Sequence, residues 1–228
     1  MAKILLGILA GDIRGSIGST TFSRNTFANY IRNKTSPVNP NTVAQQLVRN
    51  RLSAMSQSWA GIGEANRISW IDGAPTWTNN NIFNQAIDYT GFSLYGRLNR
   101  NRQEINEPFI DTFVLPAEVD SFTSFSLVAD TTGGTMEITF DPAIAADHKV
   151  IIRATRPLTQ GTNFVRNEFR KIAVLDSGNV SPVDLAAFYI AVFGVLPPVN
   201  SKIFVDAKQV LISNGQNSVP IKDSAIVL

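Results

Sequence analysis

The sequence contains no cysteine and only one histidine among its 228 residues. The absence of cysteine excludes disulfides and thiolate metal sites, and it leaves the redox compartment of the protein open. A single histidine cannot supply the paired imidazoles of a two-histidine metal site, and the chain contains no D-x-D-x-D-G calcium loop. We therefore expect neither a resident metal ion nor another cofactor.

Charged residues are also scarce, at 17% of the chain, whereas Asn, Ser and Thr are plentiful. Residues 1–110 carry 11 Lys and Arg against 6 Asp and Glu, and residues 111–228 carry 9 against 12. A basic front and an acidic remainder predict an acidic partner or contacts between copies of the chain. The Arg residues are spread among apolar and small residues, a pattern that does not favour a nucleic-acid surface.

Long hydrophobic runs are missing as well, since no segment approaches the roughly 20 apolar residues that cross a bilayer. The first residues, MAKILLGILAG, contain one apolar run from Ile4 to Ala10, which is at the short limit for a signal peptide. Asp12 and Arg14 follow this run directly, so we expect the segment to remain in the mature chain. The 44% of apolar residues suffices for a buried core.

Residues 1–40 show no clean hydrophobic period, because four glycines interrupt the apolar runs. We interpret them as an extended arm with short strands, whose backbone polar groups must lie across another surface. Gly11, Gly15 and Gly18 give the spacing G-x-x-x-G-x-x-G, which matches neither the Rossmann nor the P-loop phosphate motif. Tight turns and close backbone approach explain these glycines better than phosphate binding does.

Residues 41–107 are predicted to form a small helical unit. Thr42 or a neighbouring Asn can cap a first helix that ends at Gly61 and Gly63. The expected inward face of this helix consists of Ala44, Val48, Leu52, Met55 and Trp59. A second helix is expected over residues 64–71, with Ile68, Trp70 and Ile71 inward, and a third over 91–105, capped by Thr90. The third helix should place Phe92, Tyr95, Leu98 and Ile105 on one side.

The aromatic residues of this unit permit two interpretations. Trp59, Trp70, Trp77, Phe92 and Tyr95 are able to form a carbohydrate platform, but their helical spacing favours the core of the unit.

A linker is expected over residues 108–120, which Pro108 and Pro116 bracket. Residues 121–228 then contain about seven short runs that are rich in β-branched and aromatic residues. These runs are 122–130, 135–141, 148–156, 169–175, 186–194, 202–212 and 224–228. Turn signals separate them, which is typical of an antiparallel β-sandwich of the immunoglobulin or fibronectin type III kind. The predicted fold class is α+β: an extended arm, a small helical unit and a sandwich.

His148 is the one side chain that invites a catalytic interpretation. It lies beside Asp147 in an expected loop before a strand. A histidine base needs a nucleophile and an orienting partner, and neighbouring side chains usually point in different directions. We therefore expect an exposed loop histidine and no catalytic residues.

The run IRGSIGSTTFSRNTFANYIRNKTSPVNPNTVAQQLVRNRLSAMSQSW, with the later NRISW and TGFSLYGRLNRN, resembles a family of proteins encoded among the structural genes of tailed phages and prophages. The resemblance covers roughly residues 11–105. Its pattern is carried by Arg32, Lys34, Pro37, Asn39, Pro40, Thr42, Gln45, Arg49, Trp59, Trp70, Gly91 and Asn99. The resemblance implies assembly into a virion and brings no catalytic residues. It leaves positions in the head, neck and tail open.

These observations predict a non-enzymatic structural protein of a virion, assembled in the host cytoplasm. Its expected partners are capsid, portal, neck or tail subunits and copies of itself, with nucleic acid disfavoured and no membrane. The mix of aromatics and Arg between Phe22 and Arg32 also fits a single-strand surface, so contact of the arm with DNA stays an open alternative. The expected partner-binding residues of the arm are Phe22, Phe27, Tyr30 and Ile31 as apolar anchors, with Arg24, Arg32 and Lys34 as polar contacts. A carbohydrate-binding host-recognition module is the alternative, and a hydrolase that depends on His148 is a third hypothesis.

Overall fold

The computed structural model describes residues 2–4, 12–25, 28–35, 38–80 and 83–228. The chain divides into two compact units, Met1–Leu94 and Tyr95–Leu228. This division falls inside the helix α3, which spans Gly91–Glu104. Helices and several antiparallel sheets occur together in the described residues, so the predicted α+β class is confirmed.

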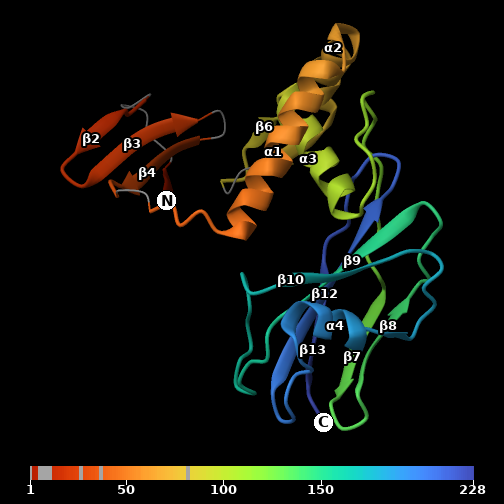
Figure 1. The fold of residues 1–228 in the computed structure, drawn as a ribbon. Coiled ribbons are helices and arrows are strands. Elements are labelled where there is room, and N and C mark those ends of the chain that lie inside the picture. Colours follow the sequence, from red (N-terminus) through yellow and green to blue (C-terminus); the bar gives the residue numbers. More distant parts are fainter. Residues whose placement is uncertain (1, 5–11, 26–27, 36–37, 81–82) are drawn as a thin grey trace. The chain divides into compact units, whose positions relative to one another are not determined.

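The first unit begins with a small antiparallel sheet rather than an isolated extended arm (Figure 1). Its strands are β1 (Ala2–Ile4), β2 (Gly15–Ile17), β3 (Thr20–Asn25) and β4 (Ala28–Asn33), in the order β1-β4-β3-β2. Gly18 closes the β2–β3 hairpin with a φ of 58°, the left-handed conformation that a tight turn requires. Pairing within this sheet satisfies the backbone groups between adjacent strands, so the prediction that this backbone needs a foreign surface is wrong for those groups.

The helices of the first unit begin where the sequence predicts. They are α1 (Val43–Gly61), α2 (Glu64–Gly73) and the start of α3, with a 3₁₀ turn η1 (Ala74–Thr76) and the short strands β5 (Thr78–Asn80) and β6 (Ala86–Asp88) between α2 and α3. Thr42 and Gln45 form a reciprocal capping box at the start of α1. Thr90 caps α3, because its hydroxyl accepts the Ser93 amide at 3.2 Å.

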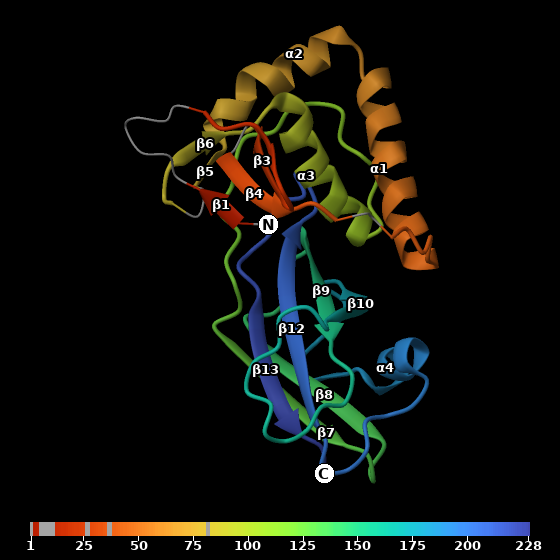
Figure 2. The same cartoon turned by 90° about the vertical axis from the view of Figure 1, so that its left-hand side faces the viewer.

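The second unit contains two antiparallel sheets, with β12 between β9 and β13 in the larger one (Figure 2). The larger sheet has the order β10 (Arg170–Leu175), β9 (His148–Ala154), β12 (Lys202–Leu211), β13 (Ile221–Ile226), and the smaller has the order β11 (Val183–Asp184), β8 (Thr135–Asp141), β7 (Ser124–Asp130). Side chains from both sheets form one apolar core, which includes Met136, Ile138, Ile152 and Val205. The alternation predicted for residues 135–141 is confirmed, since every second side chain is buried.

One predicted strand is wrong. Residues 186–193 form the helix α4 (Ala186–Phe193), which contacts β10 and β8. The run is apolar throughout, and such a run has no period that separates a buried helix from a buried strand. Gly194 ends the helix with a φ of 88°, which is a common helix C-terminal signal.

The expected linker contains no helix or strand between residues 108 and 120, and side chains of α3 hold its beginning. Asn99 is fully buried and exchanges two hydrogen bonds with the backbone of Ile110. Arg102 donates from Nε to the carbonyl oxygen of Pro108 at 2.6 Å. Burial lowers the pKa of the Arg102 guanidinium, whereas the nearby Glu107 raises it.

Candidate interaction surface

The predicted contact residues of the arm lie on both faces of the small sheet. Phe22 pairs directly with Ile31, and Ser23 pairs with Tyr30. Because side chains alternate along a strand, Phe22, Arg24 and Ile31 share one face, while Tyr30 and Arg32 occupy the other. Phe27 lies outside the described residues.

The burial of these side chains divides them by type. Phe22, Tyr30 and Ile31 are half-buried, whereas Arg24, Arg32 and Lys34 are exposed. The three cations are therefore accessible for contact with a partner. The apolar residues contribute to the sheet itself, and they do not form one continuous set of anchors.

The segment before α1 is fastened to the helix by an exposed arginine. Arg49 donates to the side-chain oxygens of Asn41, at 2.8 Å, and Asn39, at 2.5 Å. Gln46 donates to the carbonyl oxygen of Asn41, whose φ is 50°. Asn tolerates this left-handed conformation better than most residues do. Together with the Thr42 cap, these bonds give a local structural role to much of the sequence pattern around residue 40.

Four exposed apolar side chains lie close together in sequence on the first three turns of α1. We call this group the α1 apolar surface and define it by Val43, Leu47, Val48 and Leu52. Their side chains are 82%, 50%, 62% and 55% exposed, respectively. The helix itself contributes two arginines and no acidic residue.

This surface corrects part of the predicted packing of α1. Met55 is buried and Trp59 is half-buried, but Ala44, Val48 and Leu52 are exposed. In α2, Trp70 is fully buried, whereas Ile68 and Ile71 are about half exposed and thus not inward as predicted. Periodicity identifies the apolar side of a helix, but it does not tell which turns another element covers.

The aromatic residues of the helical unit belong mainly to the interior. Trp70, Trp77 and Tyr95 are buried, which confirms the prediction of a core for these three. Trp59 packs edge-on against Phe92, with ring centroids 5.7 Å apart. Phe92 remains 38% exposed, less inward than expected. No open platform of tryptophan rings is present among these residues.

His148 is neither exposed nor in a loop, contrary to the sequence prediction. It is the first residue of β9, its side chain is 17% exposed, and Nδ1 lies 2.7 Å from Oδ1 of Asp147. The bond to His148 lowers the pKa of the Asp147 carboxyl group. In the part of the chain that the structure describes, the ring has no other polar contact, so a hydroxyl nucleophile is missing from this pair.

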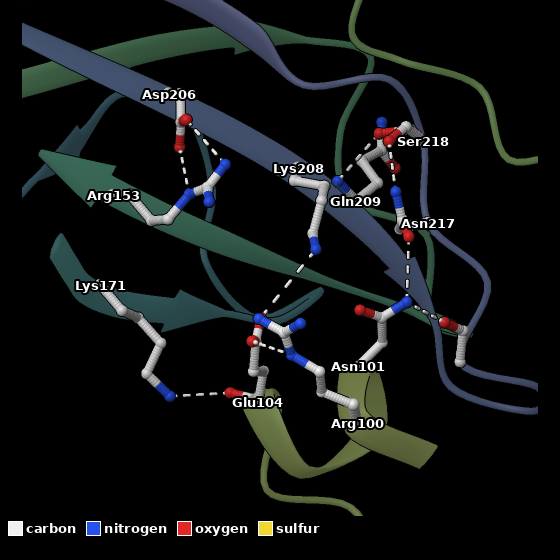
Figure 3. A network of polar contacts seen from close by, with 11 residues as sticks. Arg100, Asn101, Glu104, Arg153, Lys171, Asp206, Lys208, Gln209, Asn217 and Ser218 are labelled. Atoms are coloured by element: carbon white, nitrogen blue, oxygen red, sulfur yellow. Dashed lines mark hydrogen bonds and ion pairs between the residues drawn. The ribbon is translucent and has the colours of Figure 1, made fainter. Parts of the chain in front are cut away.

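A polar network joins the C-terminal half of α3 to the larger sheet (Figure 3). The carboxylate of Glu104 lies 3.5 Å from Nε of Arg100 and 4.0 Å from Nζ of Lys208. Its backbone carbonyl oxygen accepts a hydrogen bond from Nζ of Lys171 at 2.7 Å. Asn101 donates to the Gly215 carbonyl and to the Asn217 side chain. These contacts tie the helix to β10, β12 and the turn after β12, which makes their role structural.

The same face of the sheet carries a buried carboxylate. Asp206 is 1% exposed and accepts a bidentate ion pair from Arg153. Nε and Nη2 of the guanidinium each donate to one carboxylate oxygen at 2.8 Å. Burial raises the pKa of Asp206, and the arginine opposes that shift. No group of three or more His, Asp or Glu side chains suited to a metal ion occurs in the described ranges. Within those ranges, no helix is long and apolar enough to cross a bilayer.

Comparison with known proteins gives no match, whether to a family model, to a curated protein or to a solved structure. The similarity to tailed-phage proteins stays a prediction from the sequence pattern.

Proposed function

We propose that this protein is a structural component of a tailed-phage virion that assembles with its neighbours through the first unit. The observation that carries the proposal is the α1 apolar surface, with Val43, Leu47, Val48 and Leu52 all at least half exposed. Exposed apolar surface that the fold does not cover is typical of protein contact sites.

The chemistry of the first unit indicates what kind of partner fits it. Burying the part of each of these four side chains that is still exposed would contribute roughly 1–2 kcal/mol before the costs of association. Arg49 and Arg51 of α1 itself add positive charge beside these side chains. An apolar groove with an acidic rim is the complementary surface, on another virion protein or on a second copy of this chain.

The second unit has a separate place in this proposal. Its two antiparallel sheets share one core. We propose that they form an immunoglobulin-like sandwich, which either projects from the surface of the virion or provides a second contact surface for neighbouring subunits. The described chemistry of His148 and Asp147 gives no nucleophile, which supports a role without catalysis.

The direct test replaces Leu47 and Leu52 by serine in the parent phage. We expect incorporation of the chain into particles to fall at least tenfold, because the partner loses apolar contacts. Leu115→Ser is the matched control, since Leu115 is 69% exposed and lies in the second unit. Phe22 and Tyr30 are less suitable targets because they are half-buried within the sheet.

Incorporation is measured by mass spectrometry of purified particles, and folding of the purified variants by circular dichroism. Normal incorporation of a folded Leu47→Ser/Leu52→Ser variant would contradict the role of the α1 apolar surface. Equal loss for Leu115→Ser would show that exposed leucines in general affect the protein, and would also contradict it.

A further inference from the structure

The outer face of the larger sheet contains a hollow of about 280 Å³. Its lining includes Arg153, Arg166, Asn167, Phe169, Asp206 and Lys222, and we call it the cationic hollow. All of these residues belong to the second unit. The hollow is thus independent of the α1 apolar surface and of the function proposed for it.

Strand pairing explains why charge collects here. Asp206 of β12 lies opposite Arg153 of β9 on one side and opposite Lys222 of β13 on the other. Directly paired residues project from the same face of a sheet, so the three side chains form one row. Arg153 contacts both oxygens of the Asp206 carboxylate.

Two cations of the hollow remain available to a ligand. Among the described residues, neither Arg166 nor Lys222 makes an ion pair, and both are exposed. The ammonium group of Lys222 lies 5.2 Å from the ring centroid of Phe169, which holds it at the hollow. Since Arg153 and Asp206 neutralise each other, the lining has an excess of two positive charges.

A second hollow, of about 250 Å³, shares Phe169 and Lys222 with the first. Its lining also includes Phe164, Phe204, Asn163 and Asp223, and we call it the aromatic hollow. The Asp223 carboxylate accepts the Leu127 amide at 2.8 Å, so it is engaged within the protein. Phe164 is 76% exposed. The exposed Phe164 thus offers an apolar face in the hollow that Lys222 also lines.

We propose that the two hollows together bind an acidic saccharide through its carboxylate. Arg166 and Lys222 contact the carboxylate, the phenylalanine rings pack against the apolar C–H face of the sugar, and Asn163 and Asn167 bond to hydroxyl groups. A few polar groups beside apolar walls are typical of small-ligand sites. A nucleic-acid strand fits less well, because it needs a positive groove that follows several phosphates.

The test uses the full chain on an array of uronic-acid oligosaccharides, each printed beside its carboxyl-reduced form. We expect binding to the acidic saccharides and at least tenfold weaker binding to the reduced ones. Arg166→Ala and Lys222→Ala should each weaken binding at least tenfold, and Phe164→Ala should weaken it as well. Arg156→Ala is the control, because Arg156 belongs to the same loop segment but lines a different hollow.

Inorganic phosphate and an oligothymidylate serve as competing probes in solution. Failure of both to displace the saccharide at matched charge concentration is the expected result. Displacement by either would overturn the saccharide assignment, and equal binding of acidic and reduced forms would overturn the role of the carboxylate. If Arg156→Ala weakened saccharide binding as much as Arg166→Ala does, the effect would be one of overall charge, and the role of the cationic hollow would be overturned. Particle incorporation of Arg166→Ala should stay normal, so failure here is distinguishable from failure of the assembly role.

Discussion

Gly215 marks a close approach between the turn after β12 and the helix α3. Its φ is 74°, and a Cβ atom there would meet the carbonyl oxygen of Leu98 and lie 3.0 Å from Cγ of Arg102. Gly215→Ala therefore combines left-handed strain with a clash against backbone. We expect the free energy of unfolding to fall by about 2–3 kcal/mol in urea denaturation followed by circular dichroism.

The control for this prediction is Gly161→Ala, in the same unit. A Cβ atom at Gly161 has no neighbour within 4 Å, so its effect should stay within roughly 0.5 kcal/mol. Equal free energies of unfolding for the Gly215→Ala variant and the wild type would contradict the close contact between this turn and α3.

Glu107 provides a test of pH dependence at the same scale. Lys149 donates to Glu107 at 2.6 Å, and this hydrogen bond lowers the pKa of the carboxyl group. A lowered pKa means that the stabilisation is present at neutral pH and is lost as the pH falls below the usual range of a glutamate. Glu107→Gln should cost roughly 0.5 kcal/mol at pH 7, as for partly exposed ion pairs.

Urea denaturation at pH 7 and at pH 3 measures this difference. The stability gap between wild type and Glu107→Gln should narrow at pH 3. Glu118→Gln is the control, because Glu118 is exposed and has no ion pair among the described residues. A gap that is the same at both pH values would exclude the Lys149 interaction as its source.

At the scale of elements, Gly91 lets the start of α3 lie directly against α2. A Cβ atom at this position would be 2.8 Å from Cγ1 and 2.9 Å from the backbone nitrogen of Ile71. Gly91→Ala should therefore destabilise the first unit by about 1–3 kcal/mol, because backbone must move. All three tryptophans of the chain lie in that unit, so tryptophan fluorescence during urea denaturation follows its unfolding separately.

Gly61→Ala is the matched change at a helical glycine with no atom near the added Cβ. It should leave the first unit unchanged or stabilise it by up to about 1 kcal/mol, since Ala is the better helix former. An equal loss of stability in Gly61→Ala and Gly91→Ala would mean that the flexibility of glycine, rather than the contact of residue 91 with Ile71, explains the result.

Elements with strong local signals were predictable from the sequence. The capping pattern at Thr42 placed the start of α1, and alternation along residues 135–141 placed β8 and its buried face. α4 was missed because its eight residues are apolar and carry no period. The exposure of Val48 and Leu52 was missed because it depends on what covers the helix, which no local pattern encodes.

At the scale of the whole molecule, contacts between residues far apart in the sequence determine the unit boundary and the lining of the hollows, and local sequence patterns do not reveal them. Asn101 of α3 bonds to Asn217, 116 residues further along the chain. Such contacts draw the end of α3 into the second unit, whereas the sequence suggested a boundary near residue 108. The cationic hollow likewise gathers residues from 153 to 222, and only the strand register brings Arg153, Asp206 and Lys222 into one row.

The measurement that tests the proposed function most directly is quantitative mass spectrometry of purified parent particles, with the copy number set against the major capsid protein. A virion structural protein should be present at a fixed stoichiometry. Hundreds of copies would indicate a place on the capsid lattice, and a dozen or so a place at the neck or tail. Absence of the chain from purified particles would contradict the structural role.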